Sequence, residues 1–235
     1  MSDNKKLLLL HSIAWMAAFI SPFLLSFAQL LSFVLFGYLI SIFGHIIGLH
    51  RYFTHASFST NRFWHYFLLF CSSIVTLGST VAWTAVHLKH HRFSDTDKDS
   101  HSPKHKGHLK VFFGYFFDAY DVEPRYAARL LKHPEHKFIH KNYFKLLSAY
   151  VLILLFINPV LIFPLWAFPT VLSVIMGGIV NVFNHWNGKV NDNKLIAWTV
   201  AGEGWHKYHH RHATAWKNPF PDFSGFLIGL IRKAQ

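Results

Sequence analysis

Charged side chains are missing from two long stretches of this sequence. No Asp, Glu, Lys or Arg occurs among the 44 residues between Lys6 and Arg51, or among the 43 residues between Lys145 and Lys189. A membrane-spanning helix needs about 20 apolar residues, so each stretch predicts two spans joined by a short turn. Buried helices of soluble proteins seldom stay apolar for so long without a charged face, and the first stretch is also too long for the apolar part of a signal peptide.

Cysteine and glutamate are scarce. Cys71 is the only cysteine, which excludes an intrachain disulfide and a metal site built from several thiolates. Glutamate occurs only at Glu123, Glu135 and Glu203. Glu203-x-x-His206 fits the Glu-x-x-His motif of carboxylate di-iron bundles, but such a site uses four glutamates. A metal site of that kind is therefore not expected here.

The apolar stretches predict four spans within a single domain, residues 1–235. The spans are expected at about 7–25, 28–48, 145–163 and 166–187. The turns between them are expected at Ser26–Gln29 and at Pro164–Pro169, because proline ends helices. Residues 50–143 and 188–235 then lie on the same side of the membrane as the N-terminus.

All of the charge falls on that side. The 23 Lys and Arg and the 11 acidic residues lie in the N-terminal, middle and C-terminal segments, and neither predicted outer turn carries any. The positive-inside rule therefore predicts that both termini and the middle segment are cytoplasmic. The net charge of +12 is interpreted as orientation and attraction to anionic headgroups, and no nucleic-acid partner is expected.

A third apolar segment, residues 61–86, is interrupted by polar side chains. It is long enough to span, but spanning would place the histidines on its two sides at opposite faces of the membrane. We therefore expect an interfacial helix. The predicted fold class is an all-α integral membrane protein with four transmembrane helices in two hairpins, an interfacial helix and a cytoplasmic helical cap.

Histidines gather at the ends of the apolar stretches. Two triplets share one spacing, His87-x-x-His90-His91 and His206-x-x-His209-His210, and a pair, His50 and His55, starts where the first stretch stops. Residues three and four apart share a helix face, so each triplet can direct three nitrogens to one place. Neutral imidazole is the commonest side-chain metal ligand, so the pattern predicts a histidine-rich site at one membrane depth that could enclose more than one transition metal.

One further pair and several isolated residues complete the candidates. Asn181 and His185 are four apart near the cytoplasmic end of the last span, which favours a functional role. The histidines of the middle segment do not repeat the triplet, and we expect ordinary solvated side chains at His101, His105, His108, His133, His136 and His140. Asp95, Asp97 and Asp99 alternate as in a calcium loop, but the required Gly and Glu are replaced by Ser100 and Lys106. A polar loop, or carboxylates that orient neighbouring histidines, remain as interpretations.

Four motifs together resemble the membrane fatty-acid desaturases, most closely the acyl-CoA (stearoyl-CoA-like) branch. They are GLHRYFTHASF at 48–58, HLKHHRFSDTDKDSHSP at 87–103, NVFNH at 181–185 and GEGWHKYHH at 202–210. Their order, spacing and relation to the predicted spans match over nearly the whole chain. One departure is Arg211-His212-Ala213, which follows the last motif where the family usually continues with Phe-Pro.

The resemblance implies a pair of irons held by nine histidines. The implied ligands are His50, His55, His87, His90, His91, His185, His206, His209 and His210, and Asn181 matches the position of a metal-bound water. The implied reaction consumes dioxygen and two electrons and removes two hydrogens from adjacent methylenes of a long-chain acyl-CoA or membrane lipid. The products are a cis double bond, expected at the 9,10 position, and water.

The resemblance also implies partners. The sequence has no His-Pro-Gly-Gly haem motif, so the electrons are expected from a separate haem or iron–sulfur carrier and its reductase. The acyl chain is expected in a closed apolar tunnel ending on the first hairpin or on residues 63–83. Candidates for its mouth are basic and aromatic residues: Arg51, Lys89, Trp186, Lys189 and Trp198.

Two other classes compete with this interpretation. A histidine-box hydroxylase of lipids or alkanes would share the metals and differ in keeping oxygen on the product. A metal transporter or membrane haem protein would need polar residues through the middle of its spans, whereas these histidines crowd one end.

Overall fold

A computed structural model of the chain describes residues 1–233, and all the regular elements within that range are helices. The described residues form no β-sheet, and the only strand-like pairing among them is an isolated bridge between Thr60 and Arg232. Four helices are long and apolar enough to cross a membrane. The predicted all-α class with four candidate spans is confirmed.

The first hairpin consists of α1 (Asp3–Leu24) and α2 (Phe27–Ser41), and α2 continues directly into a π-helix, η1 (Ile42–Thr54). Ser26 ends the turn as an N-cap whose hydroxyl accepts from the backbone N–H of Gln29, while the Gln29 side chain accepts from the Ser26 N–H. This reciprocal capping box places the turn where the sequence predicts it. The second span, predicted to end near residue 48, instead stays helical to Thr54.

The second hairpin differs more from its prediction. Helix α7 (Pro134–Ile157) is followed at once by η5 (Pro159–Leu161), η6 (Phe163–Ala167) and α8 (Phe168–Phe183). The turn therefore lies at Asn158, and its expected place at Pro164–Pro169 is wrong. Both prolines lie within the continuous helical run Pro159–Phe183, Pro164 in η6 and Pro169 at the start of α8, and neither ends it.

The predicted interfacial helix is two helices, α3 (Arg62–Ile74) and α4 (Thr80–Phe93), and neither is among the four candidate spans. The break contains Thr76 (φ 58°) and Gly78 (φ 100°), whose left-handed conformations end a helix. The first and last spans hold this break, since Thr76 O bonds His11 Nε2 at 2.7 Å and Trp166 Nε1 donates to Thr76 Oγ1 at 3.0 Å.

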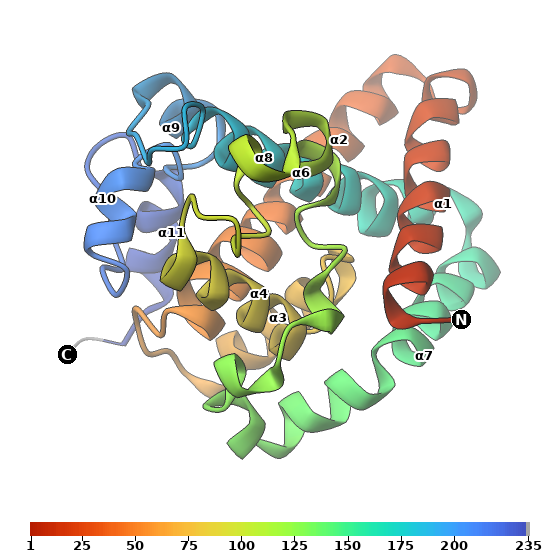
Figure 1. Ribbon diagram of the computed structural model, residues 1–235. Helices are drawn as coiled ribbons and strands as arrows, with labels where there is room; N and C mark the ends of the chain where they lie inside the picture. The colour runs from red at the N-terminus through yellow and green to blue at the C-terminus, as the bar shows by residue number, and fades with distance from the viewer. Residues whose placement is uncertain (234–235) are drawn as a thin grey trace.

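Short helices form the cap below the spans. In the middle segment they are α5 (Pro103–Lys106), α6 (His108–Gly114), η2 (Ala119–Asp121), η3 (Pro124–Ala127) and η4 (Leu130–Lys132). After the last span come α9 (Lys194–Thr199), α10 (His206–Arg211) and α11 (Phe223–Ile231). In Figure 1 the α9–α11 group lies on one side of α4 and α8, and the α1–α2 hairpin stands on the other.

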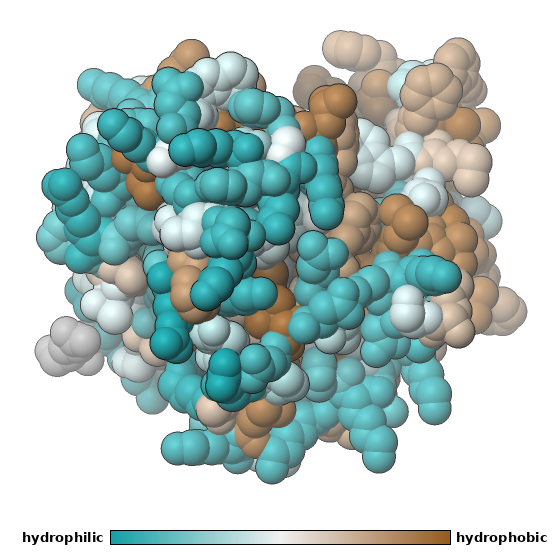
Figure 2. All heavy atoms as spheres, viewed as in Figure 1, coloured by the Kyte–Doolittle hydropathy of each residue, from teal (hydrophilic) through white to brown (hydrophobic). Residues whose placement is uncertain are grey.

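The molecule is amphipathic as a whole. Figure 2 shows hydrophobic residues over the α1–α2 hairpin and hydrophilic residues over the cap. Phe19, Phe23, Phe27 and Phe156, all on or beside the spans, are exposed by at least three quarters. Such side chains are stable in hydrocarbon and costly in water, which agrees with a membrane protein whose spans face lipid.

Candidate metal centre

The first histidine pair depends on the π-helix. Residues five apart do not share a face of an α-helix, but a π-helix bonds each N–H to the carbonyl five residues earlier. In η1 the N–H of His55 bonds His50 O at 3.1 Å, so the two residues lie one above the other and their rings are 4.9 Å apart. The π-helix thus makes His-x-x-x-x-His a one-faced pair.

The two triplets lie on α-helices, as their spacing predicts. His87, His90 and His91 are on the last turns of α4, and the second triplet supplies three of the six residues of α10. His87 stacks against Trp83 one turn earlier, with ring centroids 4.7 Å apart. His185, predicted inside the last span, lies just past it: α8 ends at Phe183 and Asn184 is its C-cap.

Five histidines form one set of converging nitrogens. Their ligand atoms lie within 4.8 Å of one another, and they are His50, His55, His87, His91 and His209. The Nε2 atoms are 3.0 Å apart in the pairs 50–209 and 87–91, and 3.1 Å apart in the pairs 55–87 and 91–209.

The remaining four form a second set beside it: His90, His185, His206 and His210. The Nε2 of His206 lies 2.9 Å from that of His185 and 3.2 Å from that of His210. Buried His90 Nε2 has no hydrogen-bond partner among the described residues. His91 of the first set stacks on His210 of the second, with ring centroids 4.3 Å apart, so the two sets adjoin.

These nitrogens have the chemistry of metal ligands. Burial lowers the pKa of His87, His90, His206 and His209 well below the ordinary value, and the neighbouring imidazoles lower it further. The same two causes lower the pKa of His210 to about 3. The rings are therefore neutral at pH 7, the form that binds metals. Nitrogens about 3 Å apart match adjacent ligands on a transition metal whose bonds are about 2.0–2.1 Å long.

Carboxylates contact three of the rings at Nδ1, the nitrogen that does not point into the sets. Asp99, fully buried, lies 3.0 Å from His90 Nδ1 through both oxygens, and Asp95 Oδ2 lies 3.0 Å from His185 Nδ1. Glu203 Oε2 lies 2.7 Å from His50 Nδ1. Each carboxylate accepts at Nδ1 and leaves Nε2 free, the arrangement that fixes a metal-binding imidazole. Of the two interpretations of the aspartates, the orienting one fits Asp95 and Asp99, while Asp97 is exposed.

Arg51 is buried beside Glu203 and does not lie at the mouth of a substrate site. Its guanidinium is 3% exposed and donates to Glu203 at 2.8–3.0 Å and to Asp222 at 2.9–3.0 Å. Burial alone would raise the pKa of Glu203, but the positive charge of Arg51 and the hydrogen bonds from His50 and Arg51 hold that pKa below the ordinary value. The expectation that Arg51 lines the substrate mouth is wrong, because its charge is already paired inside the protein.

A small cavity of about 40 Å³ lies between η1, α4, the end of α6, α8 and residues 200–206. Its lining includes His50, His87 and His206 of the two sets, and Glu203, which bonds His50. Asn181, Ile46, Trp83 and Met176 also line it. A water needs about 10–15 Å³ by this measure, so the cavity holds a few small molecules and no long acyl chain. Tyr115 closes one side, since a Cβ at Gly177 would overlap the tyrosine ring.

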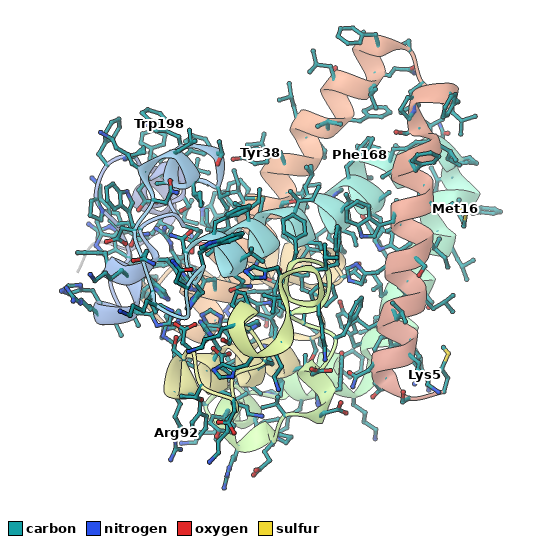
Figure 3. All side chains as sticks on the ribbon, turned by 45° about the horizontal axis from the view of Figure 1, so that its top comes forward. Lys5, Met16, Tyr38, Arg92, Phe168 and Trp198 are labelled. Carbon is teal, nitrogen blue, oxygen red and sulfur yellow. The ribbon has the colours of Figure 1, made fainter. Side chains whose placement is uncertain are left out.

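The other mouth candidates do not form one group. Lys89 is half-buried on α4, and Trp186 stacks on Phe183 at the end of α8. Figure 3 shows Trp198 at the outer edge of the molecule, on the segment that Tyr38 of α2 reaches by donating to Thr199 O at 3.0 Å. Lys189 is exposed.

Sequence reasoning missed several buried polar residues. His101 and His136, expected to be solvated, are each 2% exposed, and His101 packs against His90 with ring centroids 4.7 Å apart. Glu203 and Asp222 were not singled out as partners of the first motif, because nothing in their spacing links them to His50 or Arg51. The one signal that could have found them is that acidic residues are rare in this basic chain.

Comparison with known proteins agrees with this site. The fatty acid desaturase family matches residues 25–218, which contain all four motifs. The chain is 29% identical over 232 residues to the icosanoyl-CoA 5-desaturase of Limnanthes douglasii, with 89% of this chain and 64% of that protein covered. It is 31% identical over 192 residues to the sn-1 stearoyl-lipid 9-desaturase of Anabaena variabilis, covering 74% and 70%.

A helical membrane protein with two adjoining sets of buried histidines is thus the class that fold and site define. The chain belongs to the fatty acid desaturase family. It is also 30% identical over 210 residues to the acyl-CoA C20 Delta5-desaturase of Anemone leveillei, covering 81% and 66%. The chain spans about two thirds of the length of these curated relatives, 64–70%.

Proposed function

We propose that the chain is an oxygen-dependent fatty acyl desaturase that introduces a cis double bond into a long-chain acyl group carried by CoA or by a membrane lipid. The convergence of nine imidazoles, seven of them buried and two half-buried, into two adjoining sets carries this proposal. Family membership and relatives named as acyl-CoA and acyl-lipid desaturases support it.

We propose two irons as the bound metals, one in each set. Borderline-soft imidazole suits iron, and sets of five and four nitrogens leave room for further ligands. Two irons bound there would supply dioxygen chemistry strong enough to oxidise an unactivated methylene. The chain's own residues hold the imidazoles neutral, fix their Nδ1 atoms with Asp95, Asp99 and Glu203, and keep bulk water away by burial.

We propose that the cavity at Asn181 receives the reacting methylenes. It touches both histidine sets through His50 and His206, and Asn181 is the amide in its wall that could hold a water. An alkyl chain has no polar group for the protein to bind, and burial contributes only about 0.8 kcal/mol per methylene. We therefore propose that the shape of the site, and not binding energy, selects chain length. Ile46 of the candidate span Phe27–Thr54 and Trp83 of α4 line the same cavity, so they would contact the methylenes beside the metals.

We propose the 9,10 bond as the site of desaturation. Relatives named as 9-desaturases from Anabaena variabilis and Synechocystis support this position, while the Limnanthes and Anemone relatives are named for position 5. Regiochemistry depends on the distance from the headgroup contacts to the metals.

We also propose that both termini and the metal centre face the cytoplasm, because the positive charge lies outside the two hairpin turns. Electrons would then come from a separate cytoplasmic carrier, a haem or iron–sulfur protein, and its reductase.

Expression in a host that lacks its own desaturase tests the proposed function. Mass spectrometry with double-bond location should find a new cis-monounsaturated acid in cells with the wild-type chain, and none in cells with His90→Ala, whose ring belongs to the metal centre. A matched control is His108→Ala, which alters an exposed histidine of the cap.

The same profile distinguishes the alternatives. A hydroxylated lipid with no new double bond would identify a hydroxylase and overturn the proposal. A double bond at 5,6 would keep the enzyme class and replace the proposed position. No new lipid, in membranes that contain the inserted protein and a working reductant, would contradict the function.

A further inference from the structure

A second group of ligating side chains lies away from the nine-histidine centre. It consists of His65 near the start of α3 and of Glu135 and His136 in the first turn of α7, whose ligand atoms are all within 4.8 Å of one another. His65 Nε2 is 3.6 Å from Glu135 Oε1, and the His65 and His136 rings are 6.1 Å apart. The desaturation chemistry proposed above uses none of these residues.

A hydroxyl group lies at the Nδ1 atom of each of the two imidazoles. Tyr52 Oη lies 3.0 Å from His65 Nδ1, and Thr80 Oγ1 lies 2.8 Å from His136 Nδ1. Each hydroxyl can accept the Nδ1 proton, which fixes the tautomer with a bare Nε2. The same arrangement, with carboxylates in place of hydroxyls, occurs behind the nine-histidine centre.

The rings of His65 and His136 are buried enough to be held in place, and an ion can still reach the site. His136 is 2% exposed, and Phe53 packs edge-on against both rings, at centroid distances of 5.0 and 5.7 Å. His65 and Glu135 side chains are 23% and 24% exposed, so an ion can reach them from the adjoining cavity of about 260 Å³.

We propose that His65, Glu135 and His136 form a third metal site, for zinc, which ties α3 to the start of α7. Two imidazoles and one carboxylate match the ligands of zinc, and tetrahedral ligands at zinc lie about 3.3 Å apart, so small side-chain rotations complete the geometry. His133, whose Nδ1 is 3.7 Å from Glu135 Oε1 and whose side chain is mostly exposed, supplies the fourth ligand.

One positive charge is near this site. Arg129 lines the same cavity, but its guanidinium donates to the backbone carbonyls of Phe53 and Thr54. The zinc would join α3, which follows the first hairpin, to α7, which begins the second. Thr80 of α4 contacts the Nδ1 of His136. The role of the zinc is therefore to brace α3 on α7, the third candidate span.

Metal counting on the purified full-length protein tests the site. After loading with iron, incubation with zinc and desalting, the wild-type chain should retain one zinc that Glu135→Gln loses. Glu123→Gln is the matched control, since Glu123 lies in the same segment and its side chain is 62% exposed beside Arg125. Glu135→Asp should restore zinc, and His133→Ala should weaken its retention.

Zinc can also enter the nine-histidine centre, so a second count separates the two sites. In a His90→Ala, His209→Ala double variant, the zinc that depends on Glu135 should persist. In iron-loaded protein, whose nine-histidine centre is already filled, zinc should raise the thermal midpoint of the wild type and leave that of Glu135→Gln unchanged. Equal zinc in wild type and Glu135→Gln, or no zinc retained by the iron-loaded wild type, would overturn the proposal.

Discussion

At the scale of single residues, the site depends on carboxylates that bind the Nδ1 atoms of its imidazoles. Asp99 has no exposed surface and accepts from His90 Nδ1 and from the backbone N–H groups of Asp95 and His101. It therefore both orients a ring and folds the loop after α4. Asp97, two residues away, is exposed and makes neither contact.

This difference gives a matched pair of substitutions. Asp99→Asn keeps the shape but removes the charge that favours the Nδ1–H tautomer of His90, and the metal should be lost about 10–100 times more readily. Asp97→Asn should behave as wild type. Chelator titration of the purified protein measures both, and equal resistance of Asp99→Asn and wild type would refute the orienting role.

Arg51 carries a different residue-scale prediction. Arg51→Lys replaces a planar fork, which bonds Glu203 and Asp222 together, with a single point charge. Breaking a buried pair costs about 3–5 kcal/mol, so the thermal midpoint should fall by many degrees. Arg62→Lys, at an exposed position on α3, serves as the control, and similar midpoints for the two variants would contradict this account.

At the scale of elements, the sequence predicted helices well and their irregularities poorly. Both triplets lie on α-helices because their spacing fits 3.6 residues per turn, and the capped turn at Ser26 was readable from its residues. The π-helix η1 was not, because no composition rule distinguishes it from a longer α-helix. Nor was the turn at Asn158, because Pro164 and Pro169 give the same signal whether they end a helix or begin one.

Close packing of η1 on α3 gives the element-scale prediction. A Cβ on Gly44 would lie 2.5 Å from Cys71 O, and Ser72 Oγ donates to Gly44 O at 2.9 Å. Gly44→Ala should push α3 away, displace His50 and reduce bound metal as well as stability. Gly229→Ala is the control on α11, where the nearest atom to the added methyl is 3.8 Å away. Metal content and thermal unfolding are the measurements, and wild-type values for Gly44→Ala would exclude this coupling.

At the scale of the whole molecule, an apolar pair of hairpins supports a polar cap that encloses the histidines (Figure 2). Motif order and charge-free stretches predicted this arrangement, because they are long-range patterns that local irregularities do not erase. The pairing of the nine histidines into sets of five and four depends on how η1, α4 and α10 meet. Tertiary packing decides that, so it could not be derived from spacing alone.

The orientation of the whole molecule is a further prediction. In a Cys71→Ala background, a membrane-impermeant thiol reagent applied from outside should label Gln29→Cys, at the first turn, and not Lys104→Cys in the cap. The charge-free turn and the basic cap are the reason. Labelling of Lys104→Cys alone would invert the orientation.

The central claim is that the nine imidazoles hold two irons which the desaturation requires. Iron content and acyl-chain product, measured on the same membrane preparations, test it most directly. We expect two irons per chain and unsaturated product in the wild type and in His108→Ala, and loss of both in His90→Ala and His209→Ala, one from each set. Full activity in either of the last two variants, or a wild type that is active without iron, would contradict it.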